Sequence, residues 1–115
     1  MSYQDFEAAA AEAMHFTDLS NPDQDVYNLD LADETSDRFQ ADCKSFWYRA
    51  RCYFDAGEID DKQAGHDFWL TRNGHGAGFW DGDVKEPYGE MLTKIANSYG
   101  PFELYTGDDG TVYAA

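Results

Sequence analysis

The chain has 115 residues and a net charge of −15, from 23 acidic residues against 8 lysines and arginines, and 17% of its residues are aromatic. This length suits one domain and the aromatic content argues against wholesale disorder, while the charge disfavours direct binding to nucleic acid or an anionic membrane, since phosphates would be repelled. No apolar run approaches the ~20 residues of a membrane span, and no basic stretch precedes an apolar one, so we expect neither a transmembrane helix nor a secretory signal.

The negative charge is concentrated in the first third of the chain. Residues 1–34 contain nine acids and no lysine or arginine, whereas residues 35–72 are nearly balanced and residues 73–115 have a net charge of −5. An excess of acid often serves only to keep small proteins apart in solution. Such a concentration also fits a surface for a basic partner, and both interpretations remain open from the charge alone.

Two helices are predicted in the N-terminal half. Residues 3–15 contain a run of alanines and follow Ser2, a suitable N-cap. Residues 17–28 contain an Asn-Pro pair and scattered acids, which predict a loop. A long helix is predicted between Leu29 and Phe54, with apolar residues at helical spacing, and Gly57 is placed to end it.

The two cysteines fall on this second helix, which we read over residues 36–54. Cys43 and Cys52 are nine residues apart, so they would lie on opposite sides of the helix with an axial rise of ~13 Å. That separation excludes a disulfide between them. Cys43 lies on the apolar stripe, which favours a buried, inert thiol over a catalytic nucleophile.

The pattern changes after Gly57. Residues 66–71 predict a strand rich in aromatics, and residues 77–81 predict the returning strand of a hairpin. Between them, Asn73-Gly74 is the dipeptide most typical of a two-residue hairpin turn.

A third helix and a second hairpin are predicted to follow. Residues 87–99 have helical apolar spacing and begin with a proline. Residues 102–106 and 111–113 predict two strands joined by a Gly-Asp-Asp-Gly turn. The sequence therefore predicts an α+β fold: about three helices packed on a small antiparallel sheet of about four strands in two hairpins.

We expect residues 1–115 to form a single domain. Its acidic helical part covers residues 1–56, and its hairpin–helix–hairpin part covers residues 57–115.

The first predicted hairpin offers one candidate ligand site. Phe68 and Phe79 would share its core face, and two tryptophans the other face, either under a helix or as an exposed platform that stacks a nucleotide. The candidate ligand-binding residues of this alternative are Trp69, Arg72, His75 and Trp80. A further alternative is a small enzyme built around His66, Arg72 and His75.

Metal binding is weakly indicated. Asp23, Asp25 and Glu34 occupy positions 1, 3 and 12 of a possible calcium loop. Tyr27 and Asn28 stand where that loop needs an oxygen ligand and a glycine. We therefore expect no metal and no cofactor, and we assign no catalytic residue.

A resemblance adds to this picture. The segment DFWLTRNGHGAGFWD, residues 67–81, resembles a stretch of small uncharacterised proteins encoded by tailed bacteriophages. The resemblance covers about residues 66–113, and Gly82 stands where the relatives usually have an arginine. It implies a phage origin and no particular chemistry.

Phage origin and the acidic first third together predict an inhibitor of a host defence system of the CRISPR or restriction type. Such a protein would mimic the charge of DNA and bind, in the host cytoplasm, the basic surface of a nucleic-acid-binding protein. The candidate partner-binding residues are Asp18, Asp23, Asp25, Asp30, Asp33, Glu34 and Asp37.

Overall fold

The computed structural model describes residues 2–17, 31–81 and 84–114. These residues form five helices and one two-stranded antiparallel sheet, so the fold is α+β, as predicted, with helices in the majority. The elements are, in chain order, α1 (Tyr3–Thr17), α2 (Asp33–Ala50), α3 (Cys52–Ala56), α4 (Asp61–Arg72), α5 (Tyr88–Asn97), β1 (Leu104–Thr106) and β2 (Val112–Ala114).

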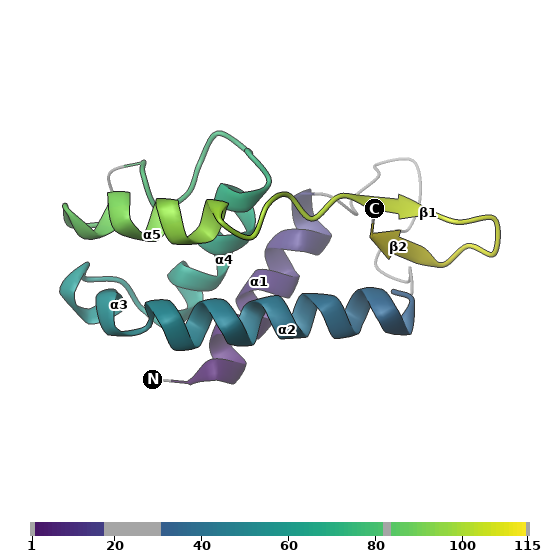
Figure 1. Ribbon diagram of the computed structural model, residues 1–115, viewed down its shortest axis with the longest axis horizontal. Helices are drawn as coiled ribbons and strands as arrows, with labels where there is room; N and C mark the ends of the chain where they lie inside the picture. The colour runs from purple at the N-terminus through teal and green to yellow at the C-terminus, as the bar shows by residue number, and fades with distance from the viewer. Residues whose placement is uncertain (1, 18–30, 82–83, 115) are drawn as a thin grey trace.

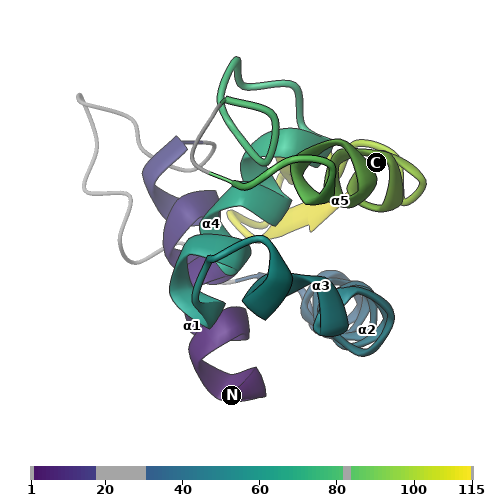
Figure 2. The same cartoon turned by 90° about the vertical axis from the view of Figure 1, so that its left-hand side faces the viewer.

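The molecule is elongated, with extents of 44 × 25 × 22 Å. Helices α2 and α5 run along the long dimension, and the β1–β2 hairpin lies at the end where α2 begins (Figure 1). Helix α3 lies at the opposite end (Figure 1). Helices α1 and α4 pack against each other beside α2 and α5 (Figure 2).

The predicted N-terminal helices are confirmed. Helix α1 begins directly after Ser2, whose Oγ accepts a hydrogen bond from the Asp5 amide at 3.3 Å, as an N-cap should. The predicted long helix is formed as α2 and α3. They are separated only at Arg51, which keeps helical angles (φ −55°, ψ −32°), and Gly57 follows the last turn.

The prediction of a hairpin over residues 66–81 is wrong, and this leaves two strands where four were expected. Residues 66–71 belong to helix α4. Asp60 caps that helix by accepting a hydrogen bond from the Gln63 amide at 2.8 Å, and Ala64 and Phe68 recur at helical spacing in the core. The strong β preference of consecutive aromatics was overridden by this cap and this period.

The Asn73-Gly74 pair ends α4 rather than turning a hairpin. Gly74 has φ +67°, and its amide donates to the Thr71 carbonyl at 3.2 Å. The next amide, of His75, donates to the Leu70 carbonyl at 3.0 Å. This pair of bonds is the usual glycine stop of a helix, which needs the same left-handed backbone as a tight hairpin turn.

The third helix and the second hairpin are confirmed as α5 and β1–β2. Tyr105 pairs with Tyr113 at the centre of the two strands, and their rings stack at 5.8 Å between centroids. The prediction of Pro87 near the start of α5 is also confirmed, since this residue directly precedes the helix.

The core is built from aromatic rings contributed by almost every element. Phe46 of α2 stacks on Phe68 of α4 at 4.2 Å between ring centroids, and Phe6 of α1 lies 5.7 Å from Phe46. Phe79, which follows the α4 stop, also lies 5.7 Å from Phe46. All four are fully buried. Rings carry much of the apolar burial because the chain has few branched aliphatic residues.

Candidate functional site

The acidic residues predicted to bind a partner fall into two groups. Asp18, Asp23, Asp25 and Asp30 lie outside the described residues. Asp33, Glu34 and Asp37 lie in the first two turns of α2, and all three are exposed. Carboxylates are favoured at a helix N-terminus because they face the positive end of the helix dipole. The helix dipole therefore gives their position a structural explanation.

The C-terminal hairpin adds two acids that the sequence did not single out. Leu31 forms a parallel bridge with Val112, and the Ala32 amide donates to the Val112 carbonyl at 2.9 Å. These bonds fix the start of α2 beside the hairpin that turns through Asp108 and Asp109 (Figure 1). We call the exposed residues Asp33, Glu34, Asp37, Asp108 and Asp109 the acidic end.

Asp109 is held by its own turn. Its carboxylate accepts a hydrogen bond from the Thr111 amide at 2.9 Å and another from the Tyr113 hydroxyl at 2.7 Å. Both bonds favour the ionised carboxylate and hold the pKa of Asp109 below its usual range. The pKa of Tyr113 is raised, first by its bond to Asp109 and in small part by the nearby charge of Glu34. Glu34 of α2 therefore lies near Tyr113 of the hairpin.

The acids at the start of α2 are exposed, and one cation, Arg38, stands four positions after Glu34 on the same helix. Within the described part of the chain, no ion pair engages Asp33, Glu34 or Asp37. The acidic end therefore presents its charge to solvent, and a cationic surface of another molecule can approach it.

The four residues of the alternative ligand site do not form an exposed platform. Trp69 is fully buried, and its Nε1 donates to Oγ1 of Thr17 at 3.1 Å. Arg72 is 4% exposed, whereas His75 is exposed and Trp80 is 52% exposed. The hairpin that would have aligned the two tryptophans is absent, because α4 is a helix.

Arg72 has a structural task instead. Its Nη2 donates to Oδ2 of Asp42 at 2.9 Å, and its Nε donates to the Gly100 carbonyl at 2.9 Å. The guanidinium carbon also lies 5.2 Å from the ring centroids of both Phe68 and Phe102. Burial lowers the pKa of Arg72, and the bond to Asp42 partly opposes that shift. Arg72 therefore joins α4 to α2 and to the segment after α5.

The three residues of the enzyme alternative, His66, Arg72 and His75, lie in different surroundings. His66 lies on the side of α4 that faces α1, where its Nε2 is 3.8 Å from Oε1 of Glu12. Arg72 is buried in the core, and His75 is exposed beyond the helix stop. Cys43 is buried and Cys52 is exposed, and both are free thiols. Burial raises the pKa of the Cys43 thiol, which leaves it protonated and unreactive.

No family model, no curated protein and no solved structure matches this chain. Its function has to be inferred from its own residues.

Proposed function

We propose that this protein is a phage-encoded inhibitor that occupies the basic nucleic-acid-binding surface of a host defence protein. The target would be an effector of the CRISPR or restriction type, in the host cytoplasm. The acidic end is the part of the described chain that makes this contact. No cofactor takes part in such an inhibition.

The observation that carries the proposal is the exposed charge of three acids at the start of α2. Asp33, Glu34 and Asp37 follow one another within five residues at the start of a rigid helix, and no ion pair in the described residues engages them. A rigid array of this kind attracts a basic groove over a distance and speeds association.

The overall charge is of the right scale for this role. A DNA duplex as long as the 44 Å molecule carries about 26 phosphate charges, at one per ~1.7 Å. The net charge of the whole chain is −15, which is more than half that number.

The ligand-binding alternative has lost its main support. A stacking platform needs exposed rings, and Trp69 is fully buried. Along the described residues, no helix is both long and apolar enough to cross a membrane.

The test is a plating assay on hosts that each carry one defined restriction or CRISPR system. The wild-type chain is expressed from a plasmid, and plaque formation by a sensitive phage is counted. We expect at least one system to be relieved, and the variant D33N/E34Q/D37N to lose most of that relief.

The matched control removes three charges at the other end of the molecule. Asp55, Glu58 and Asp60 are exposed in and after α3, and asparagine at position 60 keeps the cap of α4. D55N/E58Q/D60N should retain full relief. If no system is relieved, or if both triple variants behave alike, the proposal fails.

A further inference from the structure

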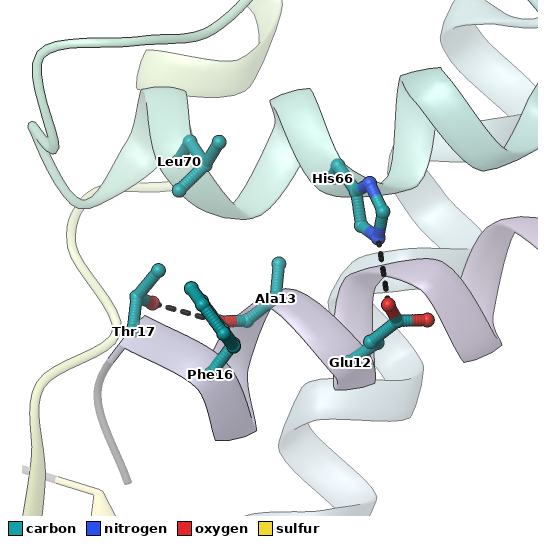
Figure 3. Close-up of a pocket in the computed structure, with 6 residues that line it drawn as sticks. All are labelled: Glu12, Ala13, Phe16, Thr17, His66 and Leu70. Atoms are coloured by element: carbon teal, nitrogen blue, oxygen red, sulfur yellow. Dashed lines mark hydrogen bonds and ion pairs between the residues drawn. The ribbon is translucent and has the colours of Figure 1, made fainter. Parts of the chain in front are cut away.

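A pocket opens between α1 and α4. Its volume is about 260 Å³. Glu12, Ala13, Phe16 and Thr17 line it from α1, and His66 and Leu70 line it from α4. Figure 3 shows the Phe16 ring and Leu70 at one end of the pocket and Glu12 with His66 at the other.

Helices α1 and α4 approach each other closely next to this pocket. Gly65 of α4 lies so near α1 that an added Cβ would meet the Phe6 carbonyl oxygen and would come within 2.8 Å of the Ala9 Cβ. One turn further along α1, Ala13 continues the row of small side chains. Ala13 is the residue of this row that lines the pocket.

The pocket has an apolar end and an anionic end. Ala13, Leu70 and the ring of Phe16 form the apolar end, and the Phe16 side chain is 74% exposed. The hydroxyl of Thr17 donates to the Ala13 carbonyl at 2.7 Å, so it is already engaged. At the other end the Glu12 side chain is 76% exposed, and its carboxylate faces His66.

A second, smaller hollow of about 130 Å³ adjoins the anionic end. It shares Glu12 and His66 with the pocket and adds Asp5 and Lys62, whose charges oppose each other. Glu12 is the acid that the two hollows share.

The size of the pocket limits what it can hold. Pockets for drug-sized ligands enclose roughly 300–1,000 Å³, so this one suits a single side chain rather than a nucleotide. The occupant has to combine an apolar stem with a cationic head. Among protein side chains, arginine has a methylene stem and a planar cation that stacks on rings and pairs with carboxylates.

We propose that this pocket receives one arginine side chain of the basic partner. The stem lies on Ala13 and Leu70, while the guanidinium stacks on Phe16 and pairs with Glu12. A guanidinium within ~6 Å of a ring centroid is attracted by the ring face, and a carboxylate can accept two of its N–H groups. This inference deepens the proposed function and rests on it for the identity of the partner.

The test uses N-acetyl-arginine amide as the probe, in a two-dimensional NMR titration at pH 7.5. N-acetyl-citrulline amide is the matched control, because it has the same shape without the charge. We expect saturable shifts at the backbone amides of Ala13, Phe16 and Leu70 with the arginine probe, and less than one-fifth of those shifts with citrulline.

Variants locate the binding to the pocket. Glu12→Gln and Phe16→Ala change exposed side chains, and each should weaken binding of the arginine probe at least fivefold. Glu90→Gln removes an acid of similar exposure, 67%, from α5 and should leave the titration unchanged. Unchanged amide signals far from the pocket report that each variant is folded.

Equal shifts with both probes, or titrations that E12Q and F16A leave unaltered, overturn the pocket assignment. The outcome is separable from that of the proposed function. If D33N/E34Q/D37N abolishes relief in the plating assay while the arginine probe does not bind, the function stands and the pocket assignment fails. If the probe binds and no defence system is relieved, the pocket assignment stands and the proposed function fails.

Discussion

Arg72 and Asp42 form an ion pair that joins α4 to α2, with Nη2 and Oδ2 2.9 Å apart. The Arg72 side chain is completely buried, whereas the Asp42 side chain is 24% exposed. The Arg72 guanidinium is therefore shielded from water, and the partly exposed carboxylate of Asp42 balances its charge.

Replacing Asp42 by alanine should destabilise the protein by about 3 kcal/mol, because it leaves a buried guanidinium without its counter-ion. Replacing both residues, as D42A/R72M, should recover part of that loss, since methionine needs no partner. Urea unfolding of both single variants and the double variant gives the coupling energy. A loss below about 1 kcal/mol for Asp42→Ala would show that the pair contributes little.

Phe79 should be a structural residue despite its place in an irregular segment. It is fully buried, and its amide donates to Oγ1 of Thr71 at 3.2 Å. Phe79→Ala should lower the free energy of unfolding by about 3–5 kcal/mol through the cavity it leaves. The neighbouring Trp80 is 52% exposed, and Trp80→Ala should cost less than about 1 kcal/mol. Similar losses from the two variants, measured by urea unfolding, would contradict this assignment.

The stability of the protein should fall as pH rises above about 9. Burial raises the pKa of Cys43 above its ordinary value of 9.0, so the folded thiol keeps a proton that the unfolded thiol releases. The folded state then binds more protons, and stability decreases by up to about 1.4 kcal/mol per pH unit for this group.

Urea midpoints at pH 8, 9 and 10 under reducing conditions measure this effect. Cys43→Ala should flatten the alkaline slope, and Cys52→Ala, at an exposed thiol, should not. Equal slopes for both variants would assign the alkaline loss to other groups, such as Tyr3, whose pKa burial also raises.

Glu58 holds a left-handed backbone with φ +62°, at the position after the α3 cap where glycine is usual. The preceding residue, Gly57, has no room for a side chain, because a Cβ at position 57 would lie 2.8 Å from Cγ1 of Val84. Glu58→Gly should therefore stabilise the protein by about 0.5–1 kcal/mol, as relief of strain exceeds the added chain entropy. Gly57→Ala should destabilise it. Thermal unfolding of both variants shows whether each one gains or loses stability. A loss of stability in Glu58→Gly would contradict the claim that the backbone at Glu58 is strained.

The elements that could be predicted are those whose local signals agree with each other. Residues 3–15 have both an N-cap and a helical period, and the Gly-Asp-Asp-Gly turn separates two short runs of β-favouring residues. At residues 66–71 the signals conflict. Aromatic composition and the following Asn73-Gly74 favour a hairpin, while Asp60 with Gln63 three positions later is a helix cap. Tertiary burial of Phe68 and Trp69 decided in favour of the helix.

The candidate sites were predictable only in part. Asp33 and Glu34 stand out because residues 1–34 contain nine acids and no lysine or arginine. Their proximity to Asp108 and Asp109 depends on the bridge between Leu31 and Val112, a contact across some 80 residues that no local pattern indicates. The burial of Arg72 was equally hidden, because its partner Asp42 lies on another helix.

Displacement of DNA tests the central claim most directly. A labelled duplex is bound to the purified defence protein that the plating assay identifies, and the chain is titrated in at 50 to 300 mM salt. We predict that the wild type displaces the duplex, that its affinity falls steeply as salt rises, and that D33N/E34Q/D37N displaces it less well with a shallower salt dependence. Inhibition with the duplex still bound, or displacement that neither salt nor the triple variant weakens, would contradict charge mimicry by the acidic end.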